Sequence, residues 1–314
     1  MCGIEQGNHM IEKALIGLLG LLLAAPVVAV ESAPTDAPQQ TGQRAVLVTG
    51  ASTGIGRKIP ERLAAEGWFV YAGARKDQDL AELAAIENVQ SVRLDVTSAA
   101  DIAAAVETIT KAGRGLYGVV NNAGVAIRAP LVETKEEDFH YVMDVNVYGP
   151  YRITKAFSPL IIAEKGRVTT ISSISGILSA PGLGVYSMSK HAIEAFGDAL
   201  AAEMAPLGVQ VSLVEPGNYR SEISRTAVKR MGADATSPLA DRSRYPEPDD
   251  VAAAVLHSLS DANPKRRYMV TPNVAEAELT IRKAIEELVQ LNQDQPYSYD
   301  RKALIEMLDA RLAQ

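Results

Sequence analysis

Apolar residues follow two different spacings along the chain from residue 44 onward. Short apolar runs, of which Ala45–Val48 is the first, alternate with longer stretches whose apolar residues recur at helical spacing. This alternation is typical of a parallel sheet covered by helices on both faces. We therefore predict a single doubly wound α/β domain over residues 44–314. The expected strands are Ala45–Val48, Phe69–Gly73, Val89–Leu94, Gly118–Asn121, Arg167–Ile171, Val209–Val214 and Tyr268–Val270.

Helices are expected between these strands and after the last of them. The longest are Glu136–Ala163 and Tyr186–Ala205, and a C-terminal helical extension from about residue 274 contains Ala275–Leu291 and Asp300–Leu312. We interpret this extension as a cover for the substrate cleft or as part of a subunit interface, and we expect a homo-oligomer. The alternative interpretation is a partner-binding module attached to the domain.

The first 43 residues have a different pattern. Ala14–Val30 is an apolar run interrupted only by glycine and proline, and residues 31–43 resemble a flexible linker. As a helix the run would span about 26 Å, slightly less than the ~30 Å hydrocarbon core of a bilayer. Its end, Val27-Val28-Ala29, has the small residues that a signal-peptidase site prefers. The segment is therefore predicted to be a membrane anchor or a cleaved signal, and both interpretations stay open.

Charge and cysteine content argue against several classes of protein. The formal net charge is -7, so no electrostatic nucleic-acid surface is expected. Cys2 is the only cysteine, and the four histidines are scattered without ligand spacing. We therefore expect neither a disulfide framework nor a metal centre.

A glycine-rich segment, Thr49–Gly56, follows the first predicted strand and opens the first helix. It has the form T-G-x-x-x-G-x-G, with glycines at positions 50, 54 and 56. Glycines at such a junction let the backbone approach a pyrophosphate, and the helix N-terminus supplies free N–H groups. The segment therefore predicts a dinucleotide site on a Rossmann-type sheet.

The end of the second strand indicates which dinucleotide is bound. An acidic residue there would accept hydrogen bonds from the ribose 2′-hydroxyl of NAD(H). Here Arg75 and Lys76 come first, and the nearest acid is Asp77. Because Arg75, helped by Lys76 or Arg57, can pair with a 2′-phosphate, NADP(H) is favoured over NAD(H). The alternative is that these are ordinary surface cations.

A candidate proton-transfer group lies farther along the chain. Tyr186 and Lys190 are one helical turn apart, so the lysine ammonium can lie beside the phenol and favour the phenolate. Ser173, near a strand end, can hold the oxygen of an alcohol or ketone. Because Tyr-x-x-x-Lys is common by chance, the weight of this group depends on the motifs upstream of it.

The order of these motifs resembles that of the short-chain dehydrogenase/reductase family. The similarity extends from residue 44 to about residue 270. The residues that carry it are Thr49–Gly56, Asp95, Asn121–Gly124, Asn146, Ser173, Tyr186, Lys190 and Pro216-Gly217. Asp144–Asn146 and Glu194–Leu200 are similar to the branch that contains retinol and 17β-hydroxysteroid dehydrogenases. Glu215–Tyr219 is similar both to that branch and to mitochondrial 3-hydroxybutyrate dehydrogenases.

The resemblance implies catalytic roles for four residues. Tyr186 would be the acid or base, Lys190 would lower its pKa and bind the nicotinamide ribose, and Ser173 would polarise the substrate oxygen. Asn146 would hold a water that links Lys190 to solvent. Ser221 stands where the family often has threonine, a departure that keeps the hydroxyl. The expected cofactor-binding residues are Thr49, Gly50, Ser52, Gly54, Ile55, Gly56, Arg75, Asp95, Val96, Asn122, Ala123, Gly124, Tyr186, Lys190, Pro216, Gly217 and Ser221.

We therefore expect an oxidoreductase that transfers a hydride between NADP(H) and a carbonyl or secondary alcohol. In this fold the segment from Asn218 to about Tyr245 would cover the substrate. Its apolar residues, which favour a lipophilic substrate, are Ile223, Val228, Met231 and Leu239. One alternative is an NAD-dependent dehydrogenase acting on a small hydroxy acid, and a less favoured one is a cofactor-sensing protein without turnover.

The expected location follows from the cofactor and from the N-terminal segment. A supply of NADP(H) favours a cytoplasmic catalytic domain, attached to a membrane through residues 14–30. A cleaved signal would instead favour export.

Overall fold

The computed structural model describes residues 42–232 and 241–313. The predicted anchor or signal at residues 14–30, and Leu239 of the predicted substrate cover, lie outside the described residues. Within the described part of the chain, no helix is long and apolar enough to cross a membrane.

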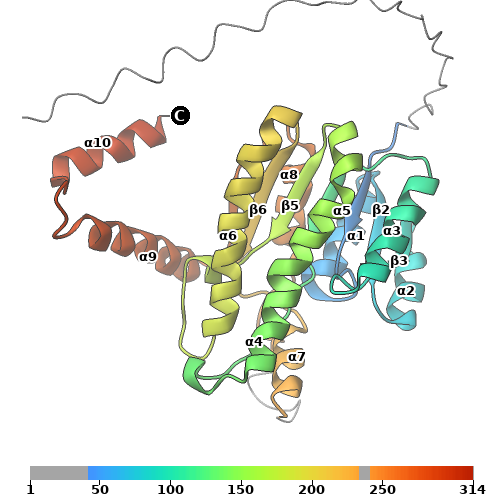
Figure 1. Ribbon diagram of the computed structural model, residues 1–314, viewed down its shortest axis with the longest axis horizontal. Coiled ribbons are helices and arrows are strands. Elements are labelled where there is room, and N and C mark those ends of the chain that lie inside the picture. The colour runs from blue at the N-terminus through green and yellow to red at the C-terminus, as the bar shows by residue number, and fades with distance from the viewer. Residues whose placement is uncertain (1–41, 233–240, 314) are drawn as a thin grey trace, which may run out of the picture. The chain divides into compact units, whose positions relative to one another are not determined.

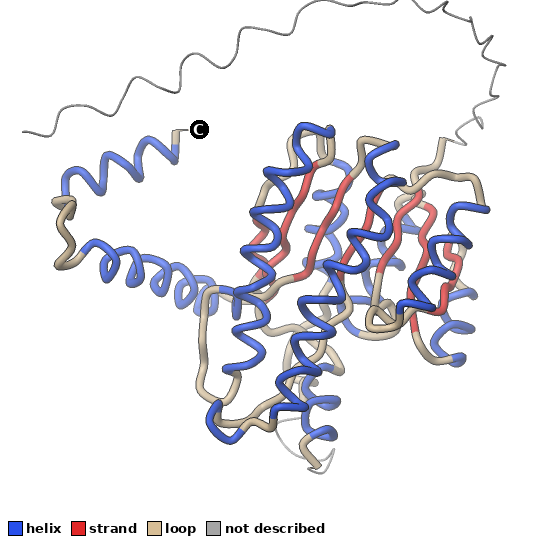
Figure 2. Tube along the Cα trace, in the orientation of Figure 1, coloured by secondary structure: helices blue, strands red, loops and turns tan. Residues whose placement is uncertain are grey.

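Seven parallel strands form a single sheet in the order β3-β2-β1-β4-β5-β6-β7. Figure 2 draws the strands in red, between the helices. The strands are β1 Ala45–Val48, β2 Phe69–Ala74, β3 Val89–Arg93, β4 Gly118–Asn121, β5 Arg167–Ile171, β6 Gln210–Pro216 and β7 Arg267–Val270. The order reverses between β1 and β4, and the crevice beyond the carboxyl ends of these two strands is where such sheets bind ligands. The predicted doubly wound architecture is confirmed.

Side chains of β1 show how the two faces of the sheet are buried. Val46 and Val48 belong to an apolar cluster that contains residues of three helices. Ala45 and Leu47 belong to a second cluster, which contains residues of three other helices. The first set is α1 Gly54–Ala65, α2 Asp77–Ala84 and α8 Asp249–Ser260, and the second is α3 Ala99–Lys111, α5 Gly149–Ala163 and α6 Gly184–Met204. A strand buried on both faces needs apolar residues at every position, which explains the unbroken run in β1.

The helix predicted over residues 136–163 is interrupted. It consists of α4 Glu136–Met143, a π-turn at Asp144–Tyr148 and α5. Periodicity alone predicts one helix here, because a single wider turn leaves the apolar spacing on each side nearly unchanged. The π-turn contains Asn146, which is buried, and such turns occur frequently at functional sites.

The C-terminal extension contains α9 Val274–Asn292 and α10 Arg301–Leu312, close to the predicted ranges (Figure 1). The Asn273 side chain caps α9, and Glu276 in its first turn accepts a hydrogen bond from the backbone of Asn218 at 2.8 Å. Thr280 is fully buried, but it is the only residue of α9 that is. The extension is therefore joined to the loop after β6 through the start of α9.

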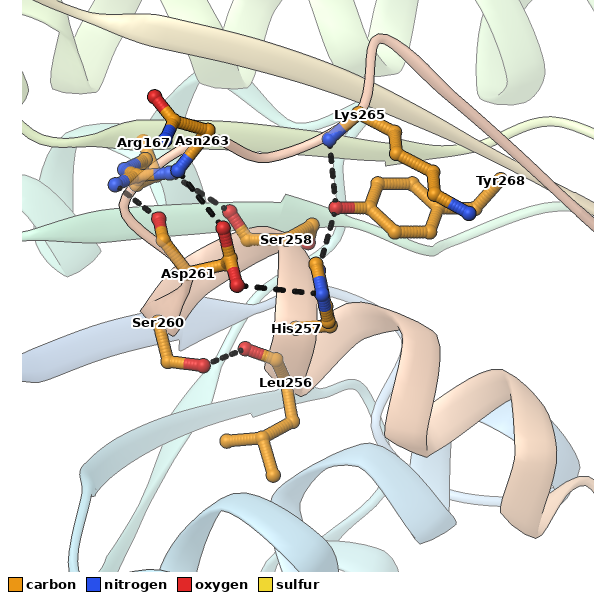
Figure 3. Close-up of polar contacts among 9 residues, drawn as sticks. All are labelled: Arg167, Leu256, His257, Ser258, Ser260, Asp261, Asn263, Lys265 and Tyr268. Atoms are coloured by element: carbon orange, nitrogen blue, oxygen red, sulfur yellow. Dashed lines mark hydrogen bonds and ion pairs between the residues drawn. The ribbon is translucent and has the colours of Figure 1, made fainter.

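A polar network near the amino ends of β5 and β7 fastens the end of α8 (Figure 3). Arg167, the buried first residue of β5, donates to the carbonyl oxygens of Ser258 and Asp261 at 3.3 and 2.8 Å. Tyr268 of β7 bonds to His257 at 2.9 Å. A cation at the last carbonyls of a helix is favourable. The network therefore stabilises the end of the sheet at which the strands begin, opposite to their carboxyl ends.

Candidate active site

The glycine-rich segment forms the turn between β1 and α1. Gly50 and Gly54 have φ of +64° and +54°, in the left-handed region that favours glycine. A Cβ on Gly50 would lie 2.7 Å from Cα of Ala123, and one on Gly56 would overlap the carbonyl oxygen of Gly50. Only glycine therefore fits these three positions.

Thr49 and Asn122 hold this turn in shape. The Thr49 hydroxyl accepts hydrogen bonds from the backbone N–H groups of Asn122 and Ala123, at 3.0 and 3.1 Å. The Asn122 amide donates to the carbonyl oxygens of Thr49 and Gly50, at 2.9 and 3.0 Å. Both side chains are thus engaged within the protein, and they would act on a cofactor by positioning the turn.

The N-terminus of α1 has the features of an anion-binding site. Its N-cap, Thr53, makes no side-chain hydrogen bond to the helix, and its first turn contains no acidic residue. In contrast, side chains of Ser98, Asn273 and Asp300 cap α3, α9 and α10. The N–H groups of α1 and the positive end of its dipole therefore fit a pyrophosphate beside the glycine turn.

The cations predicted near the end of β2 are exposed to different degrees. The Arg75 side chain is 60% exposed and lies 3.5 Å from the carboxylate of Asp95. Lys76 is also exposed. Arg57, in contrast, pairs with Glu61 at 2.7 Å. Of the three predicted cations, Arg75 and Lys76 are therefore the better placed to meet a phosphate.

Asp95 is an anionic acceptor. Partial burial acts to raise its pKa, but hydrogen bonds from the backbone and hydroxyl of Thr97, together with the charge of Arg75, outweigh burial and lower it. The next residue, Val96, is buried with its side chain in the apolar core. A cofactor would therefore meet the backbone of Val96 rather than its side chain.

The structure brings together Ser173, Tyr186 and Lys190 from β5 and α6. Ser173 is buried just beyond β5, where its hydroxyl accepts from the backbone N–H of Ser175 at 3.1 Å and acts to lower the pKa of Tyr186. Lys190 is buried on α6, where its Nζ donates to the carbonyl oxygen of Ile171 at 2.9 Å. Nζ lies 5.7 Å from the centroid of the Tyr186 ring. The sequence-predicted serine, tyrosine and lysine thus form one cluster.

Burial dominates the protonation of this cluster. It raises the pKa of Tyr186 above its usual value, against the opposing effects of the Ser173 hydrogen bond and the charge of Arg242. Burial also lowers the pKa of Lys190 to about 8, against the opposing charge of Glu194. At neutral pH Tyr186 is therefore protonated and suited to donate a proton. The tuning of Tyr186 by Lys190 stays a prediction from the sequence, and the structure adds Arg242, whose charge acts to lower the pKa of Tyr186.

Asn146 is anchored by its side-chain amide. Its Oδ1 accepts from the backbone of Val125 at 2.8 Å, and its Nδ2 donates to the carbonyl of Val125 and to the Ser189 hydroxyl, at 2.9 and 3.0 Å. Ser189 in turn donates to the carbonyl of Tyr186 at 2.7 Å. Both amide protons of the Asn146 side chain are therefore used. A water that links Lys190 to solvent would have to donate a hydrogen bond to an oxygen of the π-turn. Ser189 was not singled out from the sequence, although its place one helical turn after Tyr186 is the signal for it.

The loops after β4 and β6 connect the glycine turn to the catalytic cluster. A Cβ on Gly124 would lie 3.6 Å from Oδ1 of Asn146 and 3.9 Å from Nζ of Lys190, so Gly124 lies beside both side chains. The Ser173 hydroxyl donates to the carbonyl of Pro216 at 3.4 Å. Ser221 lies against the glycine turn, since a Cβ on Gly54 would be 3.0 Å from Cα of Ser221.

Sequence reasoning missed two arginines, Arg242, whose charge acts on the pKa of Tyr186, and Arg128, whose charge acts on the pKa of Arg242. Arg242 donates to the Ser224 hydroxyl at 2.7 Å and to the Asn218 side chain at 2.8 Å. Burial lowers the pKa of Arg242, the charge of Tyr186 opposes this, and the charge of Arg128 adds to it. The signal was present, because residues 218–245 contain five arginines, but only the apolar residues of that segment were considered.

A group of carboxylates lies near Lys190. Arg267 of β7 donates to Glu194 and Asp198 of α6, at 3.0 and 2.8 Å. Glu215 of β6 is buried beside them, and its Oε1 has no hydrogen-bond partner. Burial, and then the charge of Glu194, raise the pKa of Glu215 to about 7. Glu215 is therefore the carboxylate of this group that keeps its proton up to about neutral pH.

Comparison with known proteins gives a consistent result. The family model described as short chain dehydrogenase matches residues 44–232. The chain is 33% identical over 260 residues to the mitochondrial D-beta-hydroxybutyrate dehydrogenase of Rattus norvegicus, over 72% of this chain and 76% of that protein. It is 38% identical over 185 residues to retinol dehydrogenase 5 of Mus musculus, over 57% of this chain and 58% of that protein.

Solved structures agree with these relatives. The actinorhodin polyketide ketoreductase with NADPH is 26% identical, with a TM-score of 0.66, over 74% of this chain and 96% of that chain. A short chain dehydrogenase/reductase from Burkholderia phymatum in complex with NAD shares the fold, with a TM-score of 0.70 and 24% identity, over 82% of this chain and 98% of that chain.

Proposed function

Because the chain belongs to the short-chain dehydrogenase family, we propose that it transfers a hydride between NADP(H) and the carbonyl or secondary-alcohol carbon of a lipophilic substrate. Membership makes it an oxidoreductase that acts on alcohols or ketones with a nicotinamide cofactor. The observation that carries the proposal is the position of Gly124, on the loop after β4. Lys190 and Asn146 lie beside it, so the catalytic cluster adjoins the crevice in which the glycine turn would hold a dinucleotide.

The mechanism follows from the protonation of the cluster. When bound, the nicotinamide supplies or accepts the hydride. In reduction, Ser173 holds the carbonyl oxygen, and Tyr186 donates its proton as negative charge develops on that oxygen. Lys190 is positioned by the carbonyl of Ile171, and its charge favours the phenolate that remains. Oxidation runs through the same groups in reverse.

NADP(H) is favoured by the exposed charges at the end of β2. Arg75 is bonded only weakly there, because an ion pair at 3.5 Å with an arginine that is 60% exposed contributes little energy. The nearest acid in the sequence, Asp77, comes two residues after Arg75 and pairs with Arg93 at the surface. Arg75 can therefore turn to a 2′-phosphate at small cost.

A lipophilic substrate is favoured by the apolar side chains around the site. Ile127 and Val185 are buried in one cluster that adjoins Tyr186 in the chain, and Val228 of α7 Ile223–Arg230 is also buried. The second candidate, a hydroxy acid, is favoured by one observation, the half-buried cation Arg242 near the catalytic tyrosine. A cofactor-sensing protein without turnover has no need for a preserved Ser173, Tyr186 and Lys190, so we disfavour it.

Attachment to a membrane through residues 14–30 and a cytoplasmic catalytic domain stay proposals from the sequence. Their support is the apolar run itself, which lies outside the described residues. Recovery of the full chain in the soluble fraction of lysed cells would contradict attachment.

The function is tested by NADPH oxidation with a panel of ketones. The panel contains a steroid ketone, retinal, a medium-chain 3-oxo ester and an oxo acid. At least one ketone is expected to be reduced, and Tyr186→Phe is expected to lower kcat by roughly 10²–10⁴ because it removes the proton donor. NADPH affinity should change little. Tyr151→Phe, at an exposed position of α5, is the matched control and should keep full activity. Normal turnover by Tyr186→Phe would refute the assigned mechanism.

A further inference from the structure

Arginines are frequent around the segment that would cover the substrate, and most of them are neutralised. Three arginines of residues 218–245 each pair with a carboxylate, at 2.6 to 2.9 Å. These pairs are Arg220 with Glu247, Arg225 with Glu222 and Arg230 with Asp138. Among the residues that the structure describes, no carboxylate lies within ion-pair distance of Arg242 or of Arg128.

Arg242 is held in place by neutral groups. Its Nε donates to the Ser224 hydroxyl at 2.7 Å, and one terminal nitrogen donates to the Asn218 side chain at 2.8 Å. The guanidinium also lies 4.9 Å from the ring centroid of Tyr245. These contacts fix its position without cancelling its charge. Asn218 directly follows Gly217, so the guanidinium is fixed to the loop that leads away from the catalytic cluster.

Arg128 approaches the same place from the loop after β4. The backbone of Ala129 donates to the carbonyl of Gly182 at 3.0 Å, and a Cβ on Gly182 would lie 3.8 Å from Cγ of Arg128. The backbone N–H of Arg128 points at the Met231 sulfur, 3.3 Å away, just beyond α7. Three segments therefore converge here, one of which leads within four residues to Tyr186.

Electrostatics at this point are unbalanced. The charge of Arg242 acts on the pKa of Tyr186, but a protonated tyrosine is neutral and does not balance that charge. The charge of Arg128 repels Arg242. A half-buried cation beside a second cation is costly unless an anion joins them. A carboxylate would relieve the repulsion, and a guanidinium can bind it through two parallel hydrogen bonds.

We propose that Arg242, with Arg128 nearby, binds a carboxylate of the substrate. The substrate is then an oxo acid, or the corresponding hydroxy acid, whose remaining part contacts the apolar side chains of the site. Arg242 is the residue that distinguishes an acid from a neutral ketone. The proposal rests on the proposed function, because it places the ketone of the same molecule at Ser173 and Tyr186.

The test is a calorimetric titration of the full chain, with and without NADP⁺, which cannot reduce a ketone. The ligands are 3-oxobutanoate, 4-oxopentanoate and 5-oxohexanoate, each compared with its primary amide. For at least one pair the carboxylate is expected to bind tenfold or more tightly, about 1.4 kcal/mol. Arg242→Gln should abolish this preference, and Arg242→Lys, which keeps the charge, should retain part of it.

Arg244→Gln is the matched control, since Arg244 lies two residues away, is exposed and donates to the Tyr245 hydroxyl. It should leave the carboxylate preference unchanged. Equal affinity within every pair, or no binding of any carboxylate, overturns the proposal. Weaker NADP⁺ binding by Arg242→Gln would assign the arginine to the cofactor instead. An equal loss for acid and amide would make its role structural.

Failure of this proposal can be separated from failure of the proposed function. Reduction of neutral ketones without any preference for carboxylates would contradict only the role of Arg242. Absence of NADP⁺ binding would contradict the function, whereas the carboxylate preference can still be measured without cofactor.

Discussion

Single residues determine which protonation state the site offers. Burial of Tyr186 raises its pKa, so the free protein presents a phenol rather than a phenolate at neutral pH. Lys190, whose pKa lies at about 8, is charged below that pH. A protonated tyrosine is the form needed to deliver a proton to a reduced carbonyl oxygen. The free protein therefore presents Tyr186 in the protonation state that proton delivery requires.

The predicted preference for NADPH over NADH also depends on a single residue, Arg75. Its exposed guanidinium makes one long ion pair, at 3.5 Å with Asp95. We expect NADPH to bind at least tenfold more tightly than NADH, about 1.4 kcal/mol, because only NADPH supplies a phosphate to pair with. Arg75→Asp should remove that difference by repelling the 2′-phosphate. Fluorescence titration with both cofactors measures it.

Arg62→Asp is the control for the charge change alone. Arg62 is half exposed near the end of α1 and pairs with Glu66 at 2.9 Å. Its substitution changes the net charge by the same amount and should leave the cofactor preference intact. Wild-type protein that binds NADH as tightly as NADPH would contradict the assignment to Arg75.

At the scale of elements, the contact of α6, β6 and β7 contains a pH-sensitive cluster. The cluster contains two carboxylates, Glu194 of α6 and Glu215 of β6. Both lie within ion-pair distance of one cation, Arg267 of β7. Burial raises the pKa of Glu215 to about 7, compared with 4.5 in the unfolded chain. As pH rises between these two values, the unfolded chain releases its proton first, so the free energy of unfolding falls.

Glu215→Gln tests this cluster through stability. The wild-type protein should lose up to about 3 kcal/mol between pH 5 and pH 8 through this residue. The variant keeps the shape of the side chain without its charge, so its unfolding midpoint should fall less over the same range. Thermal or urea unfolding at the two pH values measures this. Glu66→Gln, at the surface in a pair with Arg62, is the control and should follow the wild type. An unchanged pH dependence in Glu215→Gln would mean that Glu215 is ionised throughout.

At the scale of the whole molecule, the C-terminal extension leaves an apolar surface uncovered. Five side chains on one face of α9 are each at least 44% exposed, and we call them the α9 stripe. Its residues are Val274, Ile281, Ile285, Leu288 and Val289. A contiguous exposed apolar surface on a soluble domain is typical of an interface. We propose that the stripe packs against a second copy of the chain, in keeping with the expected homo-oligomer.

Sedimentation of the chain that begins at residue 42 measures this association. The mass should correspond to at least two chains. Ile285→Glu combined with Leu288→Glu should shift the protein toward the monomer, because it places charges in the centre of the stripe. Glu286→Ala with Glu287→Ala, on the polar face of the same helix, is the control. A wild-type monomer at micromolar concentration would contradict the proposal.

Much of the fold could be predicted because its signals are local. Strand β1 is recognised from four consecutive apolar residues, and the glycine turn from a motif of eight residues. Alternation of strands and helices predicts parallel strands joined by right-handed crossovers, whereas the order of the strands came from the structure. Tyr186 and Lys190 were found because a helix places residues four apart on one face.

Contacts between distant segments could not be predicted in this way. The bond between Arg242 and Asn218 spans 24 positions, and the contact between Arg128 and Met231 spans 103. Neither has a periodicity or a motif, because loop conformation and not local spacing brings these residues together. The π-turn at Asn146 could not be predicted for a related reason, since the wider turn alters backbone hydrogen bonding without altering the apolar pattern.

The sequence by itself therefore determined the strands, the glycine turn and the pairing of Tyr186 with Lys190, all of which depend on short-range spacing. Ser173 was assigned through the family's order of motifs. Only the tertiary structure decided the charges around that cluster. It brought Arg242 to the catalytic tyrosine and buried Glu215 beside Glu194. Burial and the distance between charges set a pKa, and both depend on the packing of elements far apart in the chain.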